Sequence, residues 1–166
     1  MNALAACGFT YDARLRRPDG SLIDSTHAKN RVPVEGLNLI TNGIFNGGPL
    51  PGALHIGLWS GNYVPNGTET AATLATLVTE ITAYEGATRK AFLPGAVTNG
   101  GCSNADNLAV FSFLAAATAN GAFISTAPAK GATNGTLMSI VRFPSAREVD
   151  DSVYLEILSG FQFISM

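Results

Sequence analysis

Tight-turn residues divide this chain into short segments, and that feature limits the possible folds more than any other. The dipeptide Asn-Gly, a strong signal for a two-residue β-turn, begins at residues 42, 66, 99, 120 and 134, among others. From residue 89 onward, clusters of Gly, Asn, Pro and Ser separate short apolar segments, which we interpret as strands at 89–93, 108–114, 121–126, 136–142 and 153–164. Many short strands of this kind predict an all-β fold, either an antiparallel β-sandwich or a jelly roll.

The beginning of the chain has the pattern of a β-hairpin over residues 9–24. Apolar side chains alternate there with polar ones, which is the period of a half-buried strand, at Phe9, Tyr11, Ala13 and Leu15. Pro-Asp-Gly at 18–20 is turn chemistry, and a second strand follows. Because this hairpin precedes the main run of strands, we expect residues 1–34 to form an N-terminal arm and residues 35–166 to form the β-sandwich domain.

Helical patterns are rare and short. Leu37, Ile40 and Ile44 recur at helical spacing, so we expect one short helix near 36–46, although the glycines within it lower helix propensity. An apolar strand is expected within 53–61. Residues 70–84 mix helical spacing with strand-favouring threonines, and we interpret them as a helical turn near 70–76 followed by a strand.

The chain is poor in charge. Charged residues make up 13% of it, about half of the usual share in soluble domains, while hydrophobic residues make up 46%. The net charge of −2 gives no electrostatic footprint for nucleic acid or an anionic membrane, and no apolar run is long enough to span a bilayer. A surface with so few charges is weakly protected against association. We therefore expect a homo-oligomer, a dimer or a trimer.

No motif in the sequence indicates catalysis, a cofactor or a metal. Lys130-Gly-Ala-Thr-Asn-Gly135 resembles a phosphate-binding loop, but the lysine precedes the glycines and a strand follows, so we interpret it as a hairpin loop. His27 and His55 have no partner at ligand spacing and are interpreted as structural. Asp150 and Asp151 are adjacent on an extended chain and would point to opposite faces, so a turn explains them better than a carboxylate pair.

Cysteines and sequons also have simple interpretations. Cys7 and Cys102 have no metal-ligand spacing, and we interpret Cys7 as a free, partly buried thiol, with a Cys7–Cys102 disulfide as the alternative. Asn66-Gly-Thr68 and Asn134-Gly-Thr136 have the form of glycosylation sequons, but turn formation accounts for both.

Aromatic and basic side chains are the candidates for a binding surface. Aromatic residues in loops can stack on sugars or anchor a protein interface, which favours Trp59, Tyr63 and Tyr84, with core packing as the competing interpretation of Trp59. The only basic cluster consists of Arg14, Arg16 and Arg17. It can meet an acidic surface on a partner, or it can be the solvated face of the hairpin. The interface residues predicted from the sequence are therefore Phe9, Tyr11, Arg14, Arg16, Arg17, Trp59 and Tyr63.

Three phrases of the sequence resemble a group of small structural proteins of tailed bacteriophages, described as head decoration, capsid-stabilising or fibre-associated proteins. The phrases are "RRPDGSLID…KNRVPVEGLNLI", "LHIGLWSGNYVP…TETAATL…TEITAYEGATRKAF" and "GAFISTAPAKGATNGTLMS…FPSAREVDDSVYLEI". The resemblance spans about residues 9–160 and is carried by turns and strands rather than by catalytic signatures. Asp150-Asp151-Ser152 departs from it, because such chains usually have Gly-Asp before the last strand.

The resemblance implies a non-enzymatic virion protein without a cofactor. The role that we expect is that of a capsid decoration or cement protein, made in the bacterial cytoplasm and placed on the outer surface of the particle. Its expected partners are copies of itself and the major capsid protein or other virion proteins. The alternative role is that of a tail or fibre component that contacts host surface glycans.

Overall fold

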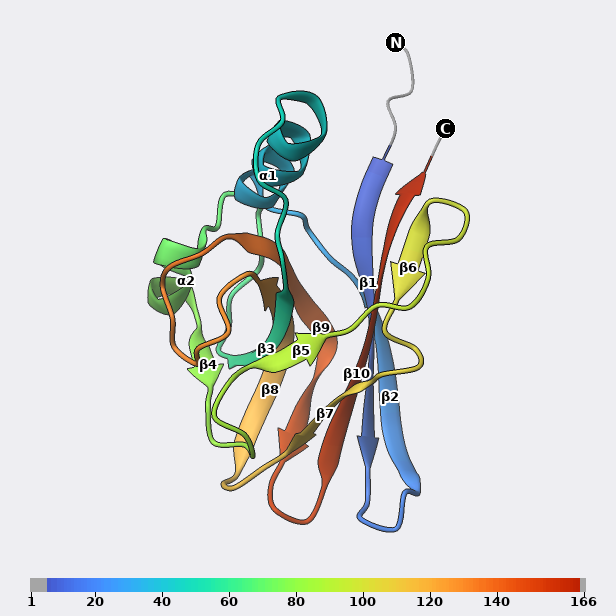
Figure 1. Ribbon diagram of the computed structural model, residues 1–166. Helices are drawn as coiled ribbons and strands as arrows, with labels where there is room; N and C mark the ends of the chain where they lie inside the picture. The colour runs from blue at the N-terminus through green and yellow to red at the C-terminus, as the bar shows by residue number, and fades with distance from the viewer. Residues whose placement is uncertain (1–5, 165–166) are drawn as a thin grey trace.

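The computed structural model describes residues 6–164, which form two antiparallel five-stranded sheets packed face to face (Figure 1). The strands of the first sheet, sheet A, are β1 (Ala6–Arg16), β2 (Leu22–Lys29), β6 (Gly101–Ser103), β7 (Ala109–Ser112) and β10 (Tyr154–Ile164). The strands of sheet B are β3 (Leu54–Ser60), β4 (Thr79–Ile81), β5 (Lys90–Phe92), β8 (Ala117–Ser125) and β9 (Leu137–Val149). The predicted all-β sandwich is confirmed.

The N-terminal hairpin is confirmed, but it is part of the sandwich and not a separate arm. β1 lies inside sheet A, where it pairs with β2 on one side and with β10 along its whole length, from Ala6↔Ile164 to Arg16↔Tyr154. The division into an arm at 1–34 and a domain at 35–166 is therefore wrong, because the first and last strands of the chain are hydrogen-bonded neighbours. Residues 1–5 and 165–166 of these two ranges lie outside the described residues.

The main core fills the space between the two sheets. The alternating residues of β1 point into it as predicted, and Phe9, Tyr11, Ala13 and Leu15 are all buried. Their inward direction follows from the two-residue period of a strand. Tyr11 also links the sheets, since its hydroxyl donates a 2.6 Å hydrogen bond to Oγ of Ser139 on β9.

A second, smaller core covers the outer face of sheet B. Helix α2 (Ala71–Leu77) lies over Trp59 and Phe123, which project from β3 and β8 on the face away from sheet A. Sheet B admits these rings because Gly57 leaves room for Phe123: a Cβ there would lie 2.2 Å from the Cζ of that ring. Thr70 begins the helix with a capping box, in which Thr70 and Thr73 satisfy each other's backbone N–H groups.

Helix α1 (Val34–Phe45) confirms the short helix expected near 36–46. Gly36 is the buried residue of this helix, and a Cβ there would lie 2.9 Å from the carbonyl oxygen of Leu137. The glycine that lowers the helix propensity is thus also the residue that lets α1 approach the backbone of β9. Figure 1 shows α1 at one end of the sandwich, beside the start of β3.

Most of the other strand predictions agree with the structure to within a few residues, with one strand predicted too short and one omitted. The expected strand at 136–142 continues to Val149 as β9, and the short strand β6 was not predicted. Asn99-Gly100 forms the predicted tight turn, with φ of +49° and +74°. Asn-Gly at residue 42 lies instead within α1, and Asn-Gly at residue 120 lies at a β-bulge inside β8, so these two turn predictions are wrong.

Candidate functional site

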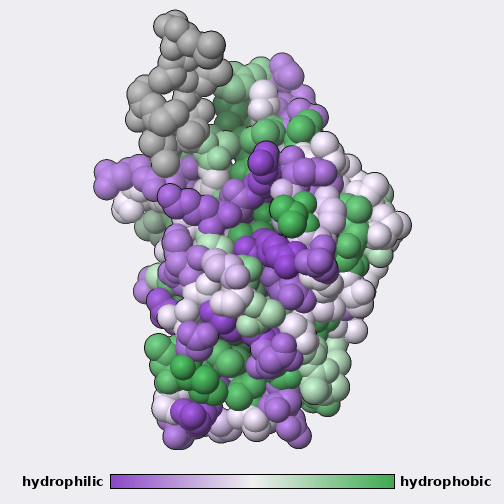
Figure 2. Space-filling view, turned by 180° about the vertical axis from the view of Figure 1, so that it is seen from behind, coloured by the Kyte–Doolittle hydropathy of each residue, from purple (hydrophilic) through white to green (hydrophobic). Residues whose placement is uncertain are grey.

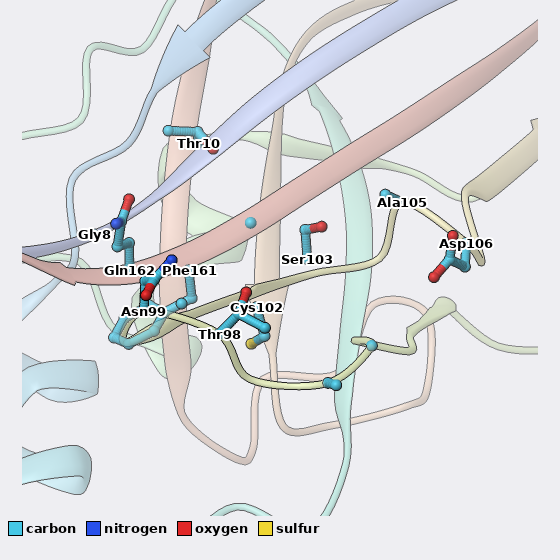
Figure 3. A pocket seen from close by; sticks show the side chains of 14 residues that line it. Gly8, Thr10, Thr98, Asn99, Cys102, Ser103, Ala105, Asp106, Phe161 and Gln162 are labelled. Atoms are coloured by element: carbon cyan, nitrogen blue, oxygen red, sulfur yellow. The ribbon is translucent and has the colours of Figure 1, made fainter.

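An open groove of about 570 Å³ lies on the outer face of sheet A (Figure 3). Its floor is formed by β1 and β10, where Gly8 pairs with Gln162 and Thr10 pairs with Gly160. Because Phe9 and Tyr11 point into the core, Gly8 and Thr10 must face outward. The wall is formed by the segment 95–106, which includes β6.

Small residues and one buried asparagine create this groove. A Cβ at Gly160 would come within 3.3 Å of the side chain of Ser103, so glycine keeps the floor low beside the wall. Asn104 is fully buried between β6 and β7, where its side chain accepts from the N–H of Ser159 at 2.6 Å and donates to the carbonyl of Ile157 at 3.1 Å. Asn104 thus continues the hydrogen-bond ladder along β10 and fixes the wall in place.

The groove offers hydroxyl, amide and backbone groups and little charge. Asp106 supplies its one carboxylate, and Thr10, Thr98 and Gln162 supply exposed polar groups. Among residues 6–164, no cluster of three or more His, Cys, Asp and Glu could hold a metal ion. Hydroxyl, amide and backbone groups of this kind can form hydrogen bonds with a polar molecule.

Three aromatic residues predicted to form an interface are buried in the protein's own interior, so their assignment is corrected. Phe9 and Tyr11 lie in the main core, and Trp59 lies in the smaller core with no exposed surface. The indole N–H of Trp59 donates to the carbonyl of Val141 at 3.1 Å, which satisfies its polar atom inside sheet B. Tyr84 is buried as well, with its ring edge-on to Phe111. The competing core interpretation of Trp59 is the one that the structure supports.

Tyr63 is half-buried in a loop that a glutamate holds in shape. Its hydroxyl donates to Glu69 at 2.7 Å, and burial together with this carboxylate raises the pKa of Tyr63 to about 12. Glu69 also accepts the backbone N–H groups of Asn66 and Gly67, at 2.6 and 2.8 Å. Burial raises the pKa of Glu69, but these hydrogen bonds outweigh it and lower the pKa overall. The loop is therefore built around a buried carboxylate that no pattern in the sequence indicated.

The three arginines of the hairpin differ in their surroundings. Arg14 and Arg16 lie on the outer face of sheet A, and Arg17 is exposed at the turn. Arg16 pairs with Glu156 at 2.6 Å, and Arg17 contacts Oγ of Ser21 at 3.3 Å. The predicted basic cluster is thus partly neutralised by the neighbouring strand β10.

The Lys130–Gly135 loop uses its lysine to hold the protein together. The ammonium group donates to the carbonyls of Thr82 and Tyr84, at 2.9 and 2.6 Å, and lies 3.7 Å from the centre of the Tyr84 ring. This cation is occupied by backbone oxygens and an aromatic face. The segment joins β8 to β9, as the interpretation as a hairpin loop predicted.

A buried ion pair beside this loop was not predicted. Arg89 has a side chain only 1% exposed and binds Glu80 through two hydrogen bonds, at 2.9 and 2.8 Å. It also donates to the carbonyls of Ala127 and Ala132, at 3.0 and 3.1 Å. Nothing in the local sequence marks this pair, because its members lie nine residues apart with an irregular segment between them.

The remaining polar candidates from the sequence are the two histidines, Asp150 and the two sequons. His27 contacts Asp12 at 2.6 Å across β1 and β2, and burial, with the charge of Arg89, lowers the pKa of His55. Asp150 accepts from the backbone N–H of Ser152 in the predicted turn. Both sequons include a glycine with positive φ, +96° at Gly67 and +85° at Gly135, as expected for turns.

Cys7 and Cys102 are both free. They lie on β1 and β6, which pair with opposite sides of β10. Two strand spacings, about 9.6 Å, are more than a disulfide can span. This separation favours the free-thiol interpretation of Cys7.

No helix among the described residues is long and apolar enough to cross a membrane. Comparisons of the chain with protein-family models, with curated proteins and with solved structures find no match.

Proposed function

We propose that the chain is a non-enzymatic structural protein of a bacteriophage particle, a decoration or cement protein on the outer surface of the head. Its partners in this proposal are copies of itself and the major capsid protein, and it is made in the bacterial cytoplasm before it joins the particle. The resemblance of residues 9–160 to small phage structural proteins supports this role. The low share of charged residues supports this role independently, because a surface with few charges is weakly protected against association.

The observation that carries the proposal is the number of large apolar side chains left at the surface. They occur on several parts of the molecule, at Leu22, Ile23, Val34, Leu37, Ile44, Phe45, Leu50, Val64, Leu77, Leu93, Val97, Val110, Leu114 and Phe163. Figure 2 shows apolar areas among the polar ones on one face. Where such side chains lie together, as Val34, Leu37, Ile44 and Phe45 do on α1, exposed apolar area favours a contact with a neighbour, and a cement protein must contact more than one.

Several charged side chains make their contacts inside the subunit and not with solvent. Arg89 and Glu80 form a buried pair, and Lys130 binds backbone carbonyls. Glu69 and Glu35 each accept two backbone N–H groups from segments that they hold together. A subunit cross-linked in this way suits a passive mechanical role, in which the shell gains strength from a rigid part that bridges it.

The test is to assemble phage heads without this protein and to add the purified protein back. We expect heads to form without it, to release DNA at a lower temperature than complete heads, and to regain stability on addition. Cryo-electron microscopy should then show the sandwich at repeated positions on the outside of the head. Failure of the purified protein to bind heads would overturn the proposal.

The open groove on sheet A favours one second candidate, a tail or fibre component that contacts host glycans. Its hydroxyl and amide groups match the hydrogen-bonding groups of sugars. Phe161 is the aromatic residue of the lining, but its ring packs on that of Phe9, with ring centres 4.8 Å apart, so stacking on a sugar would be limited. Binding to host polysaccharide that Asp106→Ala and Gln162→Ala together abolish, with no binding to heads, would favour this candidate over the decoration protein.

A further inference from the structure

The outer face of helix α1 is mostly apolar, carries no charged residue and is uncovered within the described residues. Val34, Leu37, Ile44 and Phe45 are 55%, 37%, 54% and 77% exposed. With the exposed, uncharged residues Asn38 and Thr41 they follow the spacing i, i+3, i+4, i+7, i+10 and i+11, which places them in one stripe. The stripe on the other side, with Gly36, Leu39 and Ile40, packs on the sandwich. The helix therefore has two apolar faces and buries only one of them.

A hollow of about 590 Å³ opens at the first turn of the same helix. Its apolar lining consists of Val32, Val34 and Leu37, and Cys7, Asn30, Arg31 and residues 66–68 complete it. Phe45, the most exposed of the large apolar side chains, lies eleven residues further along the helix, a distance of about 17 Å. One chain thus carries a projecting ring at one end of a stripe and a recess at the other end.

We propose that a second copy of this chain covers the stripe, with the two α1 helices antiparallel around a two-fold axis. In such a pair, each end of one helix meets the opposite end of the other, so Phe45 of each copy enters the hollow beside Val34 and Leu37 of the partner. The inference rests on the proposed function in one respect: it gives the expected self-association a definite surface.

Charge favours a copy of the chain over another kind of partner. Glu35 is the one charged residue of α1, and its carboxylate is turned inward, where it accepts the N–H groups of Ala71 at 2.9 Å and Leu137 at 2.7 Å. A stripe without charge that meets an identical stripe buries no charge of α1, and Arg31, at the edge of the hollow, is exposed and can keep its charged group in water. A charged surface of another protein would have to lose its hydration there without gaining an ionic partner.

The size of the stripe sets the expected strength of the contact. A helix of 12 residues is about 18 Å long and about 10 Å wide. The area of one such face, which is the product of these two lengths, is well below the roughly 800 Å² that each partner contributes to a stable complex. We therefore expect a weak, closed dimer in solution that becomes populated as the concentration rises.

Sedimentation velocity of the full chain tests the pair. Over a concentration range that reaches roughly 1 mM, the wild type should shift from monomer to dimer and Phe45→Asp should remain a monomer. The matched control is Leu114→Asp, an equally drastic change at a 65% exposed leucine in the β7–β8 connection, at the end of the sandwich away from α1 (Figure 1). The control should dimerise like the wild type. A wild type that stays monomeric, or a Phe45→Asp variant that still dimerises, overturns the proposal.

Cross-linking tests the antiparallel arrangement. In a Cys7→Ser, Cys102→Ser background, Thr41→Cys lies near the middle of the stripe and should be joined to its own copy by a short bis-maleimide. Val34→Cys should not, because the two-fold axis places the two copies of residue 34 at opposite ends of the helix pair. Equal cross-linking of both variants would indicate a parallel pair and would overturn the arrangement.

Head binding, measured with the same variants, separates this inference from the proposed function. A wild type that dimerises through α1 but does not bind heads would leave the dimer intact and overturn the decoration role. A wild type that is monomeric in solution and binds heads through Phe45 would overturn the dimer, since the occupant of the stripe would then be a capsid protein.

Discussion

At Gly36, helix α1 comes so close to β9 that one methyl group is expected to decide the stability of the contact. Alanine has a higher helix propensity than glycine by about 1 kcal/mol, so propensity alone would make Gly36→Ala stabilising. A Cβ would, however, lie 2.9 Å from the Leu137 carbonyl oxygen and 3.0 Å from the Cα of Met138, both of them backbone atoms. We expect a net destabilisation of about 1–2 kcal/mol, measured by urea unfolding.

Gly43→Ala, in the same helix, is the matched control. The atom nearest to its Cβ is the end of the exposed, flexible Leu50 side chain, which can move away. The gain in helix propensity should then dominate, so Gly43→Ala should be neutral or stabilising. Two alanine variants with the same sign of effect would contradict the close approach of α1 to β9.

Glu69 makes the stability of the 61–70 loop depend on pH. Burial disfavours its charged form, yet hydrogen bonds from Asn66, Tyr63 and Gly67 favour it more and lower its pKa below the ordinary value of 4.5. A carboxylate with a lowered folded-state pKa stabilises the protein above pH 4.5, and this contribution is lost as the pH falls through the folded pKa. In the same range the hydrogen bond from Tyr63 to Glu69 should weaken, because its acceptor loses its charge.

Glu69→Gln tests this carboxylate. At pH 7 we expect a loss of about 1–3 kcal/mol, because an uncharged amide accepts the three hydrogen bonds less well. Unfolding by urea should show the difference between variant and wild type shrinking below pH 4.5. A difference that stays constant down to pH 2.5 would show that the charge of Glu69 contributes nothing.

At the scale of elements, the Arg89–Glu80 pair fixes β4 to the loop between β8 and β9. Removing one partner of a buried pair typically costs about 3–5 kcal/mol, because the other charge stays buried and unpaired. Arg89→Met should lose stability in this range, since Glu80 and the carbonyls of Ala127 and Ala132 all lose a donor. Glu80→Gln together with Arg89→Met should recover part of the loss.

Arg16→Met is the comparison for this pair. Arg16 bonds to Glu156 at 2.6 Å, with the same chemistry but with a more exposed side chain, so its removal should change the urea midpoint little. Equal effects of Arg16→Met and Arg89→Met would contradict the importance of burial for the Arg89–Glu80 pair.

The same elements show what the sequence could reveal and where it could not. The spacing of apolar residues and the positions of turn residues are local properties of the sequence. The hairpin, both helices and most strands were therefore predictable to within a few residues. Asn120-Gly121 was not, because a bulge in β8 and a turn use the same residues. Gly121 is required there because its Cβ would lie 2.1 Å from the carbonyl oxygen of Val141 and 2.5 Å from the Trp59 ring, and only the tertiary structure brings these atoms to it. β6 has only three residues and depends on β10 for its pairing.

At the scale of the whole molecule, the sites depended on facts that the sequence does not contain. Phe9, Tyr11 and Trp59 were correctly recognised as aromatic residues of strands, but which face of a strand is covered depends on the other sheet. The groove brings together β1, β6 and β10, whose residues lie up to about 150 positions apart. The apolar stripe of α1 was present in the helical spacing. Its exposure follows from Gly36 and Leu39, which turn the other side of the helix toward the sandwich.

The order of the strands in sheet A leads to the most severe prediction, which concerns deletion of residues 1–34. β1 contributes Phe9, Tyr11, Ala13 and Leu15 to the core and covers one edge of β10 over eleven pairs of residues. Without β1 and β2, the core-facing side of sheet B and one edge of β10 would be open to water. Ser139 would also lose both Tyr11 and Asn30 as hydrogen-bond partners. We expect the truncated chain to be insoluble or unfolded, with no cooperative thermal transition in circular dichroism. Deletion of residues 2–5, which lie before β1, is the control and should leave the transition in place. A truncated chain that stays folded and fails only to bind heads would contradict the role of β1 as an inner strand, and would restore residues 1–34 as a separate binding arm.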